Sequence, residues 1–65
     1  MQKLKDFLRG GYLAQVIQIA NNDESSVKAL AKVFKQRNKR VKSKGLEEKI
    51  ILAAKQLHKQ LYQGN

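Results

Sequence analysis

The stretch 46-LEEKIILAAKQLHKQLY-62 decides the class of fold that this chain adopts. Its apolar residues recur at intervals of three and four, which is the spacing of an amphipathic α-helix. Glu47 and Glu48 fall in the first turn, where the helix dipole favours acidic side chains. The sequence therefore predicts a helix over 46–62, after a connection at 42–45. The apolar stripe of this helix comprises Leu46, Ile50, Ala53, Ala54, Leu57 and Leu61, extended by Ile51 and Tyr62.

A second amphipathic stretch precedes that connection and predicts a helix over 24–38. The expected N-cap of this helix is Asn22, Asp23 or Ser25, because Asn, Asp and Ser side chains commonly cap helix N-termini. Arg37 falls inside the apolar stripe, so we expect the helix to fray near that residue. The stripe itself consists of Val27, Leu30, Ala31 and Phe34.

The first twenty residues divide at Gly10-Gly11, a pair that commonly ends a helix. Apolar spacing predicts one helix over 2–9 and a second over 12–20. A single helix through the glycines would displace the apolar face by about 100°, which argues for a change of direction. A strand is the alternative for 12–20, but it would find no partner strand for its backbone groups. The expected faces carry Leu4, Phe7 and Leu8, then Tyr12, Leu13, Val16, Ile17 and Ala20.

These elements predict an all-α fold, a small bundle of three to four short helices in a single small domain over 1–65. The expected connections are two to five residues long, as helical bundles prefer. A chain of 65 residues buries only about 60% of the surface of its unfolded state, so its stability is marginal. We place Phe7 and Phe34 in the core, and Tyr12 and Tyr62 at its edge.

Composition excludes several classes of protein. The chain has no Cys, which removes disulfides, thiolate metal sites and cysteine nucleophiles. One histidine, His58, is too few for an imidazole metal site, and five acidic residues offer little for acid–base chemistry. We therefore expect no enzymatic activity, no metal and no cofactor. No apolar run resembles a secretory signal or a membrane span, so we expect a cytoplasmic protein.

The formal net charge of +9 comes almost entirely from one segment, because residues 28–44 contain eight basic residues and no acidic one. Four lysines of the segment follow the spacing i, i+4, i+7 and i+11, which places them along one side of a helix. Like charges at such spacing repel and contribute nothing to helix stability. A polyanion would remove the repulsion, and its binding would release counterions, so the pattern favours nucleic-acid binding. This lysine ridge consists of Lys28, Lys32, Lys35 and Lys39.

Amide and guanidinium side chains interrupt the lysines and are suited to reading bases. Arg pairs bidentately with guanine and Asn or Gln with adenine, whereas Lys mostly contacts phosphates. We expect the ridge, together with Lys42 and Lys44, to hold phosphates. DNA is favoured over RNA because nothing offers a platform for stacking single-stranded bases. The candidate base readers, which are otherwise ordinary polar residues at a helix end, are Gln36, Arg37, Asn38 and Arg40.

Other partners remain open at this stage. The ridge also suits an acidic protein partner, which makes a protein-interaction module the alternative function. An anionic membrane surface is disfavoured because the chain has no Trp to anchor it. A homodimer is open as well, since so small a chain gains buried area by association, with Ile51 and Leu52 as candidate contacts. Length and a Lys-, Asn- and Gln-rich composition suit a small regulatory or accessory protein of a phage or plasmid.

Overall fold

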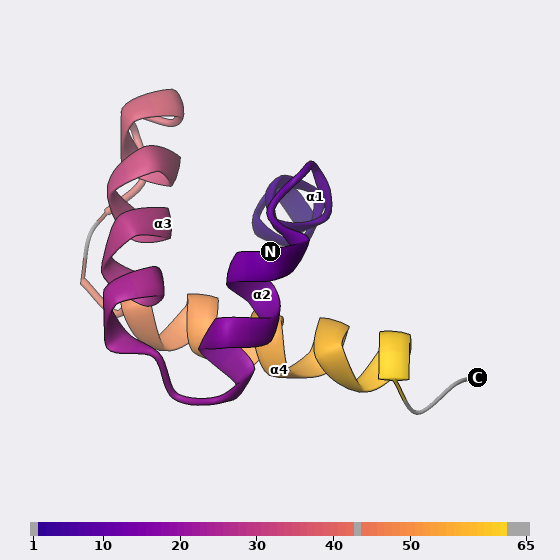
Figure 1. The fold of residues 1–65 in the computed structure, drawn as a ribbon. Helices are drawn as coiled ribbons and strands as arrows, with labels where there is room; N and C mark the ends of the chain where they lie inside the picture. Colours follow the sequence, from indigo (N-terminus) through magenta and orange to yellow (C-terminus); the bar gives the residue numbers. More distant parts are fainter. Residues whose placement is uncertain (1, 43, 63–65) are drawn as a thin grey trace.

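The helix formed by residues Leu46–Tyr62, α4, is the element on which the other three helices pack. The computed structural model describes residues 2–42 and 44–62 of the chain. One helix, α3, stands against the N-terminal part of α4, a second, α2, crosses α4, and the C-terminal end of α4 extends past both (Figure 1). The long final helix is therefore the element that all the other helices contact.

All elements of the described residues are helices, which confirms the predicted all-α fold and makes the strand alternative for residues 12–20 wrong. Their bounds agree with the expected ones to within one residue. Tyr12 immediately precedes the second helix instead of starting it, and Asn38 follows the third helix instead of ending it. Before α4 come α1 (Gln2–Arg9), α2 (Leu13–Ala20) and α3 (Glu24–Arg37).

The core is a single cluster to which all four helices contribute. Phe34, Ile19 and Ile50 are almost fully buried, and the apolar stripe predicted for α3 is buried throughout. Phe7 and Tyr12 pack against the cluster and are partly buried. The buried apolar residues are Leu4, Leu8, Val16, Ile19, Val27, Leu30, Ala31, Phe34, Leu46, Ile50, Ala53, Ala54 and Leu57.

Three apolar residues expected on buried faces are exposed instead. Leu13 is 52% exposed because α2 turns Val16 and Ile19 toward the core, a face slightly rotated from the expected one. Leu61 and Tyr62 are 54% and 59% exposed because the last turn of α4 runs beyond the helices that cover it. The predicted apolar stripe therefore lies on the correct side of α4, but its last turn extends beyond the helices that pack against it.

Aromatic side chains tie α1 and the residue before α2 to the end of α3. The ring of Phe7 lies 4.6 Å from that of Tyr12 and 5.2 Å from that of Phe34, measured between centroids. Tilted rings at such separations attract each other beyond their simple burial. This contact fixes the C-terminal end of α3 against the N-terminal part of the chain.

The corner between α2 and α3 is closed by local hydrogen bonds. Asn22 adopts a left-handed backbone conformation with φ of 67°, which Asn tolerates better than most residues. The next backbone N–H, that of Asp23, donates to the carbonyl of Gln18 over 3.0 Å, as in a Schellman motif. Asp23 is the N-cap of α3, because its carboxylate accepts from the backbone N–H of Ser25 and from the hydroxyl of Ser26. Among the three candidate caps, the structure selects Asp23.

Two glycines allow the other changes of direction. Gly11 has φ of 98° between α1 and α2, and Gly45 has φ of 75° before α4. Residues with a Cβ rarely adopt this left-handed region, whereas Gly pays no steric penalty there. The carbonyl of Gly45 then accepts the backbone N–H of Lys49 over 3.0 Å, so this residue starts the hydrogen bonding of α4.

The adjacent glycines of the first corner should respond differently to the same substitution. We expect Gly11→Ala to lower the free energy of unfolding by about 1–2 kcal/mol, because a Cβ strains its left-handed backbone. That loss corresponds to a drop in Tm of about 5–15 °C. Gly10→Ala should change stability by no more than about 0.5 kcal/mol, since its Cβ would meet only ordinary contacts, the nearest 3.5 Å away. Thermal unfolding followed by circular dichroism measures both, and equal losses would contradict this account of the corner.

Candidate functional site

The exposed side of α3 and the chain that follows it carry the eight basic side chains of residues 28–44. All eight of these side chains are exposed, as an interface with a soluble polyanion requires. The segment that contains them, residues 28–44, has no acidic residue. We use the term basic surface for Lys28, Lys32, Lys35, Arg37, Lys39, Arg40, Lys42 and Lys44.

The lysine ridge is shorter than its sequence spacing indicated. Because α3 ends at Arg37, only Lys28, Lys32 and Lys35 share the side of a regular helix, over about 10 Å at 1.5 Å per residue. Lys39 lies in the turn beyond the helix end, and its predicted helical register with the other three is wrong. The basic surface thus has two parts. Lys28, Lys32, Lys35 and Arg37 lie on α3, and four further cations lie in the irregular segment after it, namely Lys39, Arg40, Lys42 and Lys44.

The irregular segment is held by one apolar side chain and by backbone hydrogen bonds. The N–H of Val41 donates to the carbonyl of Asn38 over 3.0 Å, which closes a turn around Lys39 and Arg40. Val41 itself is half-buried and packs against the core. Since Val41 points inward, the basic residues on either side of it stay at the surface.

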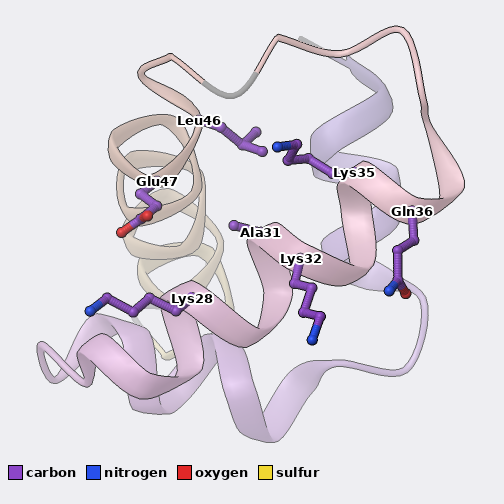
Figure 2. Close-up of a pocket in the computed structure, with 7 residues that line it drawn as sticks. All are labelled: Lys28, Ala31, Lys32, Lys35, Gln36, Leu46 and Glu47. Atoms are coloured by element: carbon purple, nitrogen blue, oxygen red, sulfur yellow. The ribbon is translucent and has the colours of Figure 1, made fainter.

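A cleft of about 440 Å³ opens between α3 and the start of α4. Its floor contains Ala31 and Leu46, which lie between the two helices (Figure 2). Lys28 and Lys35 extend toward α4 on either side of Ala31, whereas Lys32 points away from it (Figure 2). We call this feature the lysine cleft; its lining residues are Lys28, Ala31, Lys32, Lys35, Gln36, Leu46 and Glu47.

Glu47 brings a carboxylate into the lysine cleft, which the sequence did not reveal. It lies on the same side of the cleft as Lys28 (Figure 2). Among the described lining residues, three lysines face one acid, so the cleft keeps an excess of positive charge. The sequence identified Glu47 only as an acid in the first turn of a helix, because its position relative to α3 depends on how the helices cross.

The four candidate base readers differ in how far contacts within the protein restrict their side chains. The guanidinium of Arg37 lies 6.0 Å from the centroid of the Phe7 ring, a cation–π contact that helps to orient it. Asn38 donates its side-chain amide to the carbonyl of Phe34 over 3.2 Å and so caps α3. Gln36 and Arg40 are exposed, and Gln36 also lines the lysine cleft. The geometry leaves Gln36, Arg37 and Arg40 better placed than Asn38 to contact a ligand.

Exposed apolar and aromatic side chains lie elsewhere on the molecule. In the described part of the chain, the large exposed apolar residues are Leu13, Leu52, Leu61 and Tyr62, which belong to α2 and α4. Tyr62 does not lie at the core edge as expected, and it stacks instead on His58, with ring centroids 4.6 Å apart. Tyr12 does lie at the core edge. The basic surface is therefore almost purely polar.

We also searched the described residues for a metal site and for a membrane-spanning helix, and we compared the chain with known proteins. Among residues 2–42 and 44–62, no three His, Cys, Asp or Glu side chains gather as metal ligands would. No helix in the same ranges has the length and apolar character needed to cross a membrane. Comparisons with protein-family models, with curated proteins and with solved structures found no match. The basic surface with its cleft is the feature from which we infer function.

The lysine row should cost the folded protein stability. Lys32 has like charges four residues before it and three residues after it, at Lys28 and Lys35. We expect Lys32→Gln to raise the free energy of unfolding by about 0.4–1 kcal/mol in dilute buffer. The gain should vanish in about 1 M salt, where the Debye length is near 3 Å. Urea unfolding at both salt concentrations measures it, and a variant less stable than wild type in dilute buffer would show that Lys32 supports the fold.

Proposed function

We propose that this chain is a small nucleic-acid-binding protein, a regulatory or accessory factor that grips the phosphates of duplex DNA with its basic surface. The observation that carries the proposal is a set of eight exposed cations within seventeen residues of sequence, with no large exposed apolar side chain among them. Lys28, Lys32 and Lys35 contact phosphates from the helix, and the segment after it adds contacts. Such contacts release counterions, which drives binding without apolar burial.

The polar character of the basic surface favours nucleic acid over an acidic protein. Protein–protein interfaces have a core of apolar and aromatic side chains, whereas protein–DNA interfaces are more polar and much more positively charged. Ala31 and Leu46 at the floor of the lysine cleft are 8% and 2% exposed, so they offer a protein partner little area. An acidic protein partner is the alternative, and it would have to bind almost by charge alone.

Duplex DNA is favoured over RNA by the same geometry. A helix enters the major groove of B-form DNA but not the deep, narrow one of A-form RNA, and α3 carries its lysines along one exposed side. Single-stranded RNA is usually bound by stacking its bases on aromatic rings. The only aromatic residue of α3, Phe34, is 1% exposed and unavailable for stacking. Gln36, Arg37 and Arg40 are the side chains we propose as base readers, and the cytoplasmic location expected from the sequence belongs to the same proposal.

The salt dependence of DNA binding tests this function. For duplex DNA, log K should fall linearly with log salt, and replacing Lys28, Lys32 and Lys35 together by Gln should reduce the slope by about 2.7, at 0.9 per phosphate contact. Affinity in about 50 mM salt should drop roughly 100-fold, at close to 1 kcal/mol for each lysine. Fluorescence anisotropy with a labelled duplex of mixed sequence measures both quantities.

A matched control uses lysines of α4 that do not line the lysine cleft. Replacing Lys49, Lys55 and Lys59 of α4 by Gln changes the net charge equally but leaves the basic surface intact. We expect its slope to stay close to that of the wild type. Equal slopes for the two triple variants would show that charge alone, and not this surface, drives binding. The proposal fails outright if neither duplex DNA nor RNA binds in low salt, and an acidic protein that co-purifies stoichiometrically after nuclease treatment would replace it.

Removing the carboxylate from the lysine cleft should strengthen DNA binding. Glu47→Gln deletes a negative charge close to the phosphates, so we expect duplex affinity to rise about 3- to 10-fold in low salt. Glu48→Gln is the control, because Glu48 occupies the same first turn of α4 but does not line the lysine cleft. Both variants lose a similar interaction with the helix dipole, so both should lose a similar small amount of stability. A larger affinity gain for Glu48→Gln in the same anisotropy assay would place the phosphates elsewhere.

A further inference from the structure

The core of this protein is open at the end of α4. A groove of about 360 Å³ lies between the last two turns of α4 and the corner that joins α1 to α2. Its floor reaches the buried core residues Leu8, Val16 and Leu57, and its rim carries the half-exposed Leu13 and Leu61. We call this feature the apolar groove; its lining residues are Leu8, Arg9, Leu13, Val16, Leu57, Gln60 and Leu61.

The apolar groove exists because the last turn of α4 extends beyond the helices that pack against it. Leu61 follows Leu57 by one turn on the same stripe, so it faces in the direction of the core but meets no helix there. Leu13, at the first turn of α2, is left beside it. Together with Tyr62, these residues account for three of the four large apolar side chains exposed in the described part of the chain. Leu13 and Leu61 thus place exposed apolar surface at one site, as interaction surfaces commonly do.

We propose that the apolar groove is the dimer interface of this protein and that its occupant is a second copy of the chain. The surface can complement itself, because it offers both a groove and two half-exposed leucines among the residues that line it. In a two-fold contact, Leu13 and Leu61 of each copy enter the groove of the other, as an isologous interface requires. An unrelated partner would have to supply such leucines, whereas a second copy already carries them.

Electrostatics permit self-association at this end of the molecule and oppose it at the other. Two copies of a chain with net charge +9 repel unless their basic surfaces stay apart. Glu47 in the lysine cleft and Leu61 in the apolar groove are fourteen residues apart on α4, or about 21 Å at 1.5 Å per residue. That exceeds the Debye length of about 8 Å in physiological salt, so the lysine clefts of the two copies are screened from the contact.

The charged groups near the apolar groove also tolerate a second copy. Arg9 is the one charged side chain that lines the groove, and its guanidinium donates to the side-chain oxygen of Gln60 over 3.3 Å. Lys55 and Lys59 lie on the other side of α4 from Leu57 and Leu61 by helical geometry. A groove with so little charge provides nothing that would select an acidic partner.

A stable dimer would bury a moderate share of the surface of this chain. A standard interface buries about 800 Å² on each partner. This is about one sixth of the 4949 Å² of accessible surface of the chain. The residues that line the groove belong to α1, α2 and α4, so a contact centred on the groove does not require α3. Leu52, the candidate contact from the sequence, lies in a different hollow beside Lys5 and Lys49, which would place like charges in the contact.

Sedimentation equilibrium of the full chain tests the proposal, at concentrations from about 10 μM to 1 mM in physiological salt. The mass of the wild type should rise from 7.4 kDa toward twice that value. Leu61→Glu and Leu13→Glu, on different helices, should each weaken the dimer roughly 100-fold or more, because each copy loses a buried leucine and buries a charge instead. Leu52→Glu carries the same change of charge at a site that is 61% exposed, and it should dimerise like the wild type.

Each outcome decides the question. A wild type that stays monomeric up to about 1 mM overturns the proposal. So does a dimer that survives both groove variants, or one that only Leu52→Glu dissociates. Circular dichroism confirms that the variants fold, which the half-exposed positions of Leu13 and Leu61 favour. The proposal does not rest on nucleic-acid binding: a folded Leu61→Glu monomer should keep the salt-dependent binding of one basic surface, so either idea can fail alone.

Discussion

The burial of one apolar stripe, that of α4, is the constraint on which the rest of the structure depends. The other three helices are short, and two of them have only eight residues, too few to be stable alone in water. They stay helical because each packs an apolar face against α4. Ile50 and Ala54 in its middle are completely buried in the core. In this sense α4 organises the chain, and it holds α3 with its lysines exposed.

Much of the fold could be predicted because periodicity and turn chemistry are local properties. The stripe of α3, the break at Gly10-Gly11 and the acids in the first turn of α4 are all visible within a few residues of sequence. The exposed ends were not predictable, because whether Leu61 is buried depends on the length of the helices that pack against it. Leu13 was misplaced for a similar reason, since the rotation of α2 about its axis is decided by its neighbours.

The candidate site was predictable as a set of charges but not as a geometry. A run of basic residues without acids is evident in the sequence, and all of them are exposed in the structure. The end of α3 at Arg37 separates Lys39 from the helical row, and the capping bond of Asn38 restricts a residue that composition treated as a free reader. Glu47 enters the same cleft from a helix that begins nine residues after α3 ends, through a crossing that no local pattern encodes.

Under the proposed function, the two sides of α3 are subject to different constraints. Val27, Leu30, Ala31 and Phe34 hold the helix in place, while the lysines between them contribute little or nothing to the core. Selection on the fold therefore acts on one set of positions and selection on recognition on another, although the two alternate along fourteen residues. Related chains would be expected to keep the first set and to vary the second, so that one scaffold serves many ligands.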